Sequence, residues 1–68
     1  MNMIPVKSSN LSSVGYENGT LYIRFHKSGL YVYKGVPEAV YRSLMSADSH
    51  GKYFAAHIKN VYPWDKIS

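Results

Sequence analysis

The stretch Ser49-His50-Gly51-Lys52 has the residue types of an anion-binding helix start. A serine can cap a helix, and the first amides of a helix lack an acceptor inside it, so they attract negative groups. Gly51 lets a phosphate approach the backbone, and Lys52 adds positive charge. The spacing is not that of a Walker loop and does not predict a nucleotidase. We expect either a phosphate site here or an ordinary serine cap in which Gly51 makes room for packing.

A second candidate surface is a strand face that carries Tyr22, Arg24 and His26, with Lys34 nearby. Aromatic rings can stack unpaired bases, and interleaved cations can follow the phosphates of a single strand. The alternative is a solvated face whose rings a partner subunit covers. The strand lacks the aromatic signature of a classical RNA-recognition motif.

The sequence offers little for catalysis or metal binding. His26, His50 and His57 have no i,i+4 or short-loop ligand spacing, and no cysteine or carboxylate cluster supports them. Ser49 with His57 is a nucleophile–base pair that the sequence leaves open, but no third group supports it. We therefore expect a protein without catalysis, metal or cofactor.

Composition sets the class of protein. The chain has 68 residues, a formal charge of +4, seven tyrosines and no cysteine. It should be one small domain, residues 1–68, without disulfides or thiolate metal sites. No run of about 18 apolar residues predicts a membrane span, and the N-terminus does not read as a signal peptide, so we expect a cytoplasmic protein. The basic balance favours polyanionic partners, although it also suits simple solubility.

The elements that position these residues begin with a hairpin. Residues 1–7 read as a loose arm, followed by a short strand that ends at Tyr16. Asn18-Gly19 is a strong type I′ turn signal, and a two-residue loop pairs Tyr16 with Leu21 and Val14 with Ile23. The predicted inward face consists of Val14, Tyr16, Leu21, Ile23 and Phe25. Tyr22, Arg24 and His26 then face the other way.

The next turn admits two registers. A three-residue loop, Lys27-Ser28-Gly29, puts Gly29 in the left-handed position and pairs Phe25 with Tyr31 and Ile23 with Tyr33, so that both tyrosines face the core. A two-residue loop flips every side chain, and Tyr31 and Tyr33 join the open face as stacking platforms. We favour the three-residue loop, because glycine stands where that turn needs it.

Two helices follow the hairpins. Val36-Pro37-Glu38 starts the first, which should run to about Ala47. Ser49 caps the second, residues 50–58. The tail from residue 60 should be irregular or a short strand, held down by Val61, Tyr62, Trp64 and Ile67. The sequence thus predicts an α+β fold, a three-stranded antiparallel β-meander followed by two short α-helices.

Several motifs in this order resemble one known family. They are Val6-x-Ser8-Ser9, Gly15-Tyr16, Leu21-x-Ile23-x-Phe25, Tyr31-x-Tyr33, Gly35-Val36-Pro37, Ser49-x-Gly51-Lys52-Tyr53-Phe54 with Ile58, and Tyr62-Pro63. The chain resembles the KTSC domain, which occurs at the C-terminus of some bacterial lysyl-tRNA synthetases and in stand-alone proteins. The resemblance implies a three-stranded sheet with two helices and a role in RNA binding. Ala55 departs from the family pattern, which often has Asn there, so any ligand contact of that Asn is missing.

These observations lead to one functional hypothesis and two alternatives. We expect a non-catalytic accessory module that binds nucleic acid, and the resemblance favours RNA as the partner. The expected contact residues are Ser49, His50, Gly51, Lys52, Tyr22, Arg24, His26, Tyr31, Tyr33 and Lys34. One alternative is a homodimer or higher homo-oligomer that covers apolar residues such as Leu30 and Val32. The other is a phage-type oligomer that sequesters a small phosphorylated nucleotide signal.

Overall fold

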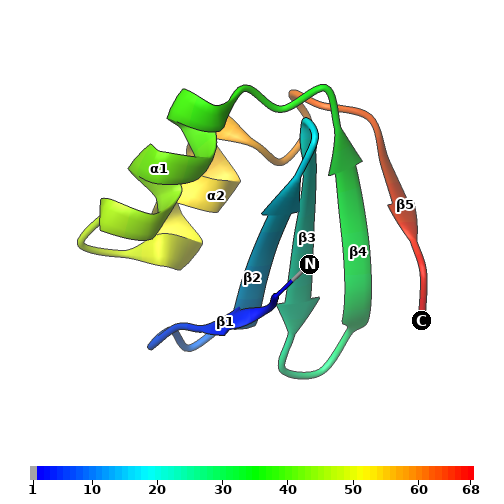
Figure 1. Cartoon of the computed structure of the whole chain (residues 1–68). Coiled ribbons are helices and arrows are strands. Elements are labelled where there is room, and N and C mark those ends of the chain that lie inside the picture. Colours follow the sequence, from blue (N-terminus) through cyan, green and yellow to red (C-terminus); the bar gives the residue numbers. More distant parts are fainter. Residues whose placement is uncertain (1) are drawn as a thin grey trace.

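A five-stranded antiparallel sheet carries both helices on one of its faces (Figure 1). The structure is a computed structural model that describes residues 2–68. In chain order the elements are β1 (Ile4–Pro5), β2 (Leu11–Glu17), β3 (Thr20–Phe25), β4 (Gly29–Lys34), α1 (Glu38–Ser46), α2 (His50–His57) and β5 (Trp64–Lys66). Strands lie in the sheet in this same order. The α+β class with two helices is therefore confirmed.

The predicted three-stranded sheet is wrong because two short strands extend it at its edges. Within the expected loose arm, Ile4 pairs with Val14 and Pro5 with Ser13. At the other edge, β5 pairs with β4. Strands of two and three residues leave no alternating pattern to detect. Met1 of the predicted arm lies outside the described residues.

The first hairpin forms as predicted. Asn18 and Gly19 have φ of 51° and 79°, the positive values that a type I′ turn requires. Tyr16 pairs with Leu21 and Val14 with Ile23. Val14, Leu21 and Ile23 are fully buried in the core beneath the helices. The turn chemistry and the alternating pattern therefore specified the same register.

The second hairpin keeps the predicted faces but not the predicted pairs. The loop has three residues, His26 to Ser28, and Gly29 already lies in β4, where it pairs with Phe25. Tyr31 therefore faces Ile23, and the prediction that Phe25 pairs with Tyr31 is wrong by two residues. A shift of two keeps every side chain on its side of the sheet, so both tyrosines of β4 still face the helices.

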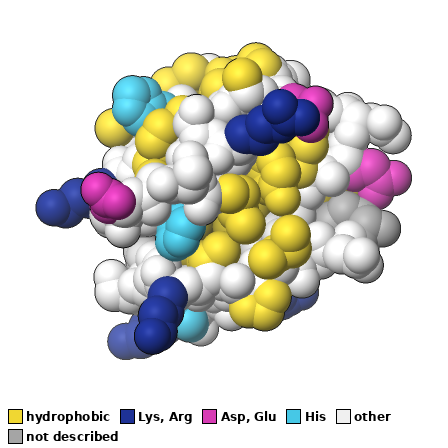
Figure 2. All heavy atoms as spheres, turned by 60° about the vertical axis from the view of Figure 1, so that its left-hand side comes forward, with side chains coloured by type: hydrophobic (Ala, Val, Ile, Leu, Met, Phe, Trp, Pro, Cys, Tyr) yellow, Lys and Arg dark blue, Asp and Glu magenta, His cyan; other side chains and the backbone are white. Residues whose placement is uncertain are grey.

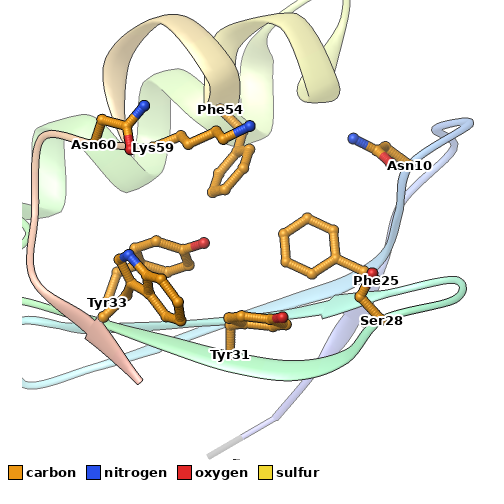
Figure 3. A pocket seen from close by; sticks show the side chains of 9 residues that line it. Asn10, Phe25, Ser28, Tyr31, Tyr33, Phe54, Lys59 and Asn60 are labelled. Carbon is orange, nitrogen blue, oxygen red and sulfur yellow. The ribbon is translucent and has the colours of Figure 1, made fainter. Parts of the chain in front are cut away.

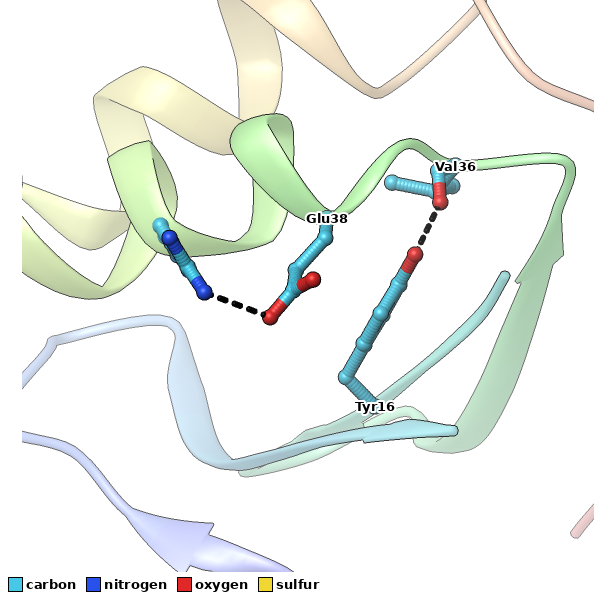
Figure 4. Close-up of polar contacts among 4 residues, drawn as sticks. Tyr16, Val36 and Glu38 are labelled. Atoms are coloured by element: carbon cyan, nitrogen blue, oxygen red, sulfur yellow. Dashed lines mark hydrogen bonds and ion pairs between the residues drawn. The ribbon is translucent and has the colours of Figure 1, made fainter. Parts of the chain in front are cut away.

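Val36 fixes the turn from β4 into α1. Its amide donates to the carbonyl of Gly19 over 2.9 Å, and its own carbonyl accepts the hydroxyl of Tyr16 (Figure 4). The ring of Tyr16 also stacks on Tyr41 of α1, with centroids 4.9 Å apart. These contacts join the tip of the first hairpin to the start of α1, so the chain must cross to the covered face.

An exposed ion pair supports α1 itself. Arg42 donates to Glu38 one turn earlier over 2.9 Å, the other contact in Figure 4. An exposed pair of this spacing contributes about 0.3–0.5 kcal/mol. Leu44 is the fully buried residue of the helix and anchors it to the core.

The C-terminal segment is held largely by its backbone and by few of its side chains. Of the four side chains expected to pin this segment, Tyr62 packs against the core, whereas Val61, Trp64 and Ile67 are 58%, 52% and 57% exposed, so the expectation is wrong for these three. Instead, the amide of Leu30 donates to the carbonyl of Ser68 over 3.0 Å, and the amide of Ile67 donates to the carbonyl of Leu30 over 2.7 Å. Trp64 is thereby left accessible on the covered side of the sheet.

We predict that Gly29→Ala lowers the free energy of unfolding more than Gly35→Ala. Both glycines have positive φ, +96° and +72°. Each substitution therefore costs about 1–3 kcal/mol in backbone strain. A Cβ on Gly29 would also collide with the carbonyl of Ser68, whereas a Cβ on Gly35 meets nothing within 4 Å. Urea denaturation compares the two variants, and equal costs would contradict the close approach of the C-terminal segment.

Candidate functional site

The predicted contact residues fall in three different places. Residues 49–52 start α2 and face the turn between β1 and β2. Tyr22, Arg24 and Lys34 lie on the open face of the sheet, by the alternation of β3 and β4. Tyr31 and Tyr33 lie on the opposite, helix-covered face, because they pair with the inward Ile23 and Leu21. One continuous surface of these residues does not exist.

A hollow of about 360 Å³ lies at the start of α2, and we call it the α2-start hollow. Its walls are residues 7–10, residues 48–52 and Ala55. Lys7 thereby joins Lys52 at one site, a pairing that sequence reasoning missed because the two residues are far apart in the chain. Asp48 also lines the hollow and offsets part of this charge.

The first turn of α2 presents free amides to this hollow. Ser49 caps the helix, since its Oγ accepts from the amide of Lys52 over 3.2 Å. The cap satisfies one amide and leaves those of His50 and Gly51 without an intrahelical acceptor. The Nδ1 of His50 donates to the carbonyl of Leu44 over 2.8 Å, which ties the helix start to the end of α1. Both original interpretations, a serine cap and an anion site, are therefore compatible.

Gly51 is open to substitution on steric grounds. A Cβ there would lie 3.6 Å from the Oγ of Ser8 and 3.7 Å from the Cβ of Asn10, which are ordinary contacts. Packing therefore does not require glycine at this position. The turn that contains Ser8 lies directly beside the helix start.

His26 holds that turn in place rather than joining the strand face. Its Nε2 donates to the carbonyl of Ser8 over 2.9 Å, and its amide donates to the carbonyl of Asn10 over 3.1 Å. The Oγ of Ser8 in turn accepts the amides of Asn10 and Leu11 over 3.2 Å each. His26 thus positions one wall of the α2-start hollow.

The open face of the sheet offers less than its sequence suggested. Lys34 lies 3.5 Å from Asp65 in an exposed ion pair, and Arg24 is exposed. Val32, expected to need cover by a partner, is only 6% exposed between Tyr22 and Asp65 of the neighbouring strands. Tyr22 is half-buried. Of the residues predicted for this face, Tyr22 remains as an aromatic ring and Arg24 as an exposed cation.

A second hollow, of about 320 Å³, opens between the end of α2 and the strands β3, β4 and β5 (Figure 3). We call it the aromatic pocket. It is lined by Asn10, Phe25, Ser28, Tyr31, Tyr33, Phe54, Lys59, Asn60 and Trp64. Five of these residues are aromatic, and they come from four different elements. Figure 3 shows Tyr31 below the cavity, Phe25 and Phe54 beside it, and the hydroxyl of Tyr33 directed into it.

Ring contacts make the walls of this pocket firm. Phe25 meets Tyr31 and Phe54 edge-on, with centroids 5.4 Å apart in each case. Trp64 is tilted by 48° against Tyr31, also at 5.4 Å, so the two rings do not stack on each other. Burial, with a smaller contribution from Tyr31, raises the pKa of Tyr33 to about 12. The Tyr33 hydroxyl therefore stays protonated at neutral pH and can donate a hydrogen bond.

Sequence reasoning identified only Tyr31 and Tyr33 in the aromatic pocket. Phe25 and Phe54 read as core, and nothing local marks Lys59, Asn60 or Trp64 as neighbours of β4. Asn60 carries one usable signal, because an Asn shortly after the end of a helix suits the left-handed region. It has φ of 66° and turns the chain at the end of α2.

The structure does not assemble the nucleophile–base pair that the sequence left open. Ser49 and His57 stand eight positions apart, at opposite ends of α2. That separation corresponds to about 12 Å along a helix. The ring of His57 lies 4.4 Å from that of Tyr53. Within residues 2–68, no group of three His, Asp or Glu side chains could hold a metal ion, and neither helix is long and apolar enough to cross a membrane.

Comparison with known proteins finds one matching family model, a similar protein sequence and a similar solved structure. Residues 7–62 match the family model of the KTSC domain. An uncharacterized protein of Stutzerimonas stutzeri strain A1501 is 39% identical over 56 residues, which cover 79% of each chain. The crystal structure of a KTSC domain protein from Yersinia pestis superposes with a TM-score of 0.96 at 40% identity, covering 98% of this chain and 97% of that one.

We predict that Ser49→Ala destabilises the protein by about 1 kcal/mol, because the amide of Lys52 loses its cap. Ser46→Ala is the matched control: its Oγ donates to the carbonyl of Ser43 over 3.4 Å near the end of α1. That long, exposed contact should contribute little. Thermal or urea unfolding measures both variants. A loss for Ser46→Ala as large as that for Ser49→Ala would show that the cap is not the cause.

Proposed function

This chain belongs to the KTSC domain family, and from that premise we propose that it is a non-catalytic, cytoplasmic nucleic-acid-binding module with RNA as its partner. The observation that carries the proposal is the position of the two hollows. They lie at opposite ends of α2, and Asn10 lines both. A site for phosphate thus adjoins a pocket lined by rings.

The α2-start hollow supplies the phosphate contacts in this proposal. Lys7 and Lys52 are exposed and line it together, and the helix start adds two amides and the positive end of its dipole. Such contacts follow the backbone of any strand and carry no sequence information. The net charge of +4 attracts a polyanion at longer range.

The open sheet face has a secondary part in the proposal. Arg24 and Tyr22 lie on the face of the sheet opposite to both hollows, so an RNA segment bound at α2 does not contact them. Lys34 forms an ion pair with Asp65, which neutralises its charge. We therefore propose the helix side as the binding surface and give its residues the first tests.

A homo-oligomer is the second candidate, favoured by apolar surface on the α1 side. Figure 2 shows hydrophobic side chains gathered in a band across the face turned forward there. The stacked Tyr16 and Tyr41 are only half-buried at the edge of the core, and Ile4 of β1 is 44% exposed. Contiguous apolar surface on a small protein is typical of interfaces.

Titration with tRNA and with single-stranded RNA at two salt concentrations tests the main proposal. We expect binding at low salt that weakens steeply as salt rises. Lys52→Ala and Lys7→Ala should weaken binding to all sequences alike, and each should lower the slope of log K against log salt by about 0.7. Fluorescence anisotropy of a labelled RNA gives both quantities.

Arg42→Ala is the matched control for these variants. It removes the same charge, but from an ion pair with Glu38 on α1. Its effect on RNA affinity should be small. The absence of binding by the unchanged protein at low salt would overturn the proposal.

Light scattering at increasing protein concentration tests the second candidate. A dimer that Ile4→Glu converts to a monomer, with RNA affinity unchanged, would support an interface on the α1 side. A monomer at every concentration would exclude it.

A further inference from the structure

We propose that the aromatic pocket holds a single unstacked nucleobase, and that Tyr33, Lys59, Asn60 and Trp64 are its recognition residues. The inference rests on the proposed function and names the part of the nucleic acid that this region binds. A free nucleotide and an unpaired base within RNA share this chemistry, and the experiment below separates them.

The hydroxyl of Tyr33 is the strongest indication of a ligand. Tyr33 is 4% exposed, yet its hydroxyl points into the cavity (Figure 3). No hydrogen bond from this hydroxyl to another side chain or to the backbone is found among residues 2–68. Among residues 2–68 no buried side-chain oxygen or nitrogen lacks a hydrogen-bond partner, so this hydroxyl is not sealed in the core but is open to the pocket. The hydroxyl is therefore placed to donate to a carbonyl oxygen or ring nitrogen of a base.

The rings around this hydroxyl suit a flat ligand. Trp64 is 52% exposed and tilted against Tyr31, so a face of the indole stays accessible for stacking. Stacking on an aromatic ring holds any of the bases, because every base has a flat π-face. The volume of about 320 Å³ is at the lower end of the usual range for small-ligand sites, which fits one base rather than several.

Polar groups on the helix side complete the pocket. Lys59 and Asn60 follow Ile58, the C-terminal cap of α2, and line the pocket from that side (Figure 3). The amide of Lys59 donates to the carbonyl of Phe54 over 2.9 Å, which fixes the backbone at this end of the helix. The carboxamide of Asn60 can donate and accept, as the edge of a base requires, and Lys59 can contact a phosphate.

The charge of the lining separates a nucleobase from other ligands of aromatic pockets. Cages for methylated lysine or choline hold a cation, and a neighbouring Lys59 would repel it. No Asp or Glu lines the aromatic pocket. A neutral heterocycle that bears a phosphate matches the rings, the amides and the single ammonium group.

Asn10 links this pocket to the α2-start hollow, because it lines both of them. When a base occupies the pocket, the RNA backbone to which it is attached therefore runs close to Lys7 and Lys52. The geometry favours an RNA strand that passes over Asn10, with a phosphate at one end of α2 and a base at the other.

Trp64 reports directly on occupancy, since it is the only tryptophan of the chain. We would titrate the protein with a single-stranded RNA octamer, the same octamer in a duplex, each nucleoside monophosphate, and inorganic phosphate, following tryptophan fluorescence. Anisotropy of labelled RNA would measure affinity separately. Quenching by the single strand, but not by the duplex or phosphate, is expected, because only an unpaired base can stack on the indole.

Three variants isolate the groups of the pocket. Tyr33→Phe removes only the hydroxyl and should weaken single-strand affinity about 3- to 10-fold. Asn60→Gly removes the carboxamide and tolerates φ of 66°, so it should lower affinity without loss of stability. Trp64→Ala should weaken binding about tenfold or more.

Matched controls separate these effects from general ones. Tyr53→Phe removes a hydroxyl on α2 from a residue that lines neither hollow, and Ile67→Ala trims an exposed apolar side chain near Trp64 in sequence. Both should bind as the unchanged protein does. Circular dichroism would confirm that each variant is folded.

Each outcome decides the inference. RNA binding by anisotropy, with no quenching and with normal affinity in Tyr33→Phe and Asn60→Gly, would overturn the base pocket and leave the proposed function standing. Quenching by monophosphates that depends on Tyr33, without any RNA binding, would support the pocket and overturn the RNA module. No change in tryptophan fluorescence or in RNA anisotropy with any probe at low salt would overturn both.

Discussion

Phe54 of α2 packs its ring edge-to-face against Phe25 and Tyr33, with both centroid distances 5.4 Å, and this contact sets the height of α2 above the sheet. The ring is 4% exposed, and burying a side chain of this kind contributes about 2–3 kcal/mol. Once α2 lies here, its start faces the turn that contains Ser8, and its end hangs over β4 and β5. Both hollows follow from the position of one helix.

The rest of the framework serves to bring α2 to that place. Val36, bonded to Gly19 and Tyr16, directs the chain out of β4 and over the sheet. His50 then ties the start of α2 to the carbonyl of Leu44. Each of these contacts satisfies a backbone group that would otherwise be left without a partner at a turn or helix end. The same polar contacts that complete the fold therefore position the candidate site.

The two hollows differ in the chemistry of their linings, and the proposed function gives each a different task. One carries lysines and helix amides, which suit phosphate, and the other carries rings and amide side chains, which suit a base. Ala55 lines the first hollow with a small apolar side chain and adds no polar group to its wall. In the proposed function, the phosphate contacts at this hollow therefore fall to Lys7, Lys52 and the free amides of α2.

Local chemistry was enough to predict the first hairpin, the serine cap of α2 and the side of the sheet on which Tyr31 and Tyr33 lie. Asn18-Gly19, Ser49 and the alternation of β3 and β4 each act over a few residues, so the sequence expresses them directly. The pairing in the second hairpin could not be read in the same way. A shift of two residues in the pairing leaves every side chain on the same face of the sheet, so the alternating pattern cannot distinguish the two registers. In the observed register Gly29 lies against the distant Ser68, a contact that local sequence does not predict.

The stretch Ser49–Lys52 shows the same division. The sequence by itself determined a capped helix start with a cation, because capping depends on neighbouring residues. Only the tertiary structure brought Lys7 to that start, engaged His26 with the Ser8 turn, and gathered Phe25, Lys59, Asn60 and Trp64 around Tyr33. These groups come from separate elements, and their meeting depends on how the sheet and helices pack. Backbone pairing with β4, together with the contacts of Trp64 with Tyr31 and of Asp65 with Lys34, holds β5 in place, and no short-range side-chain pattern in the sequence predicts these contacts.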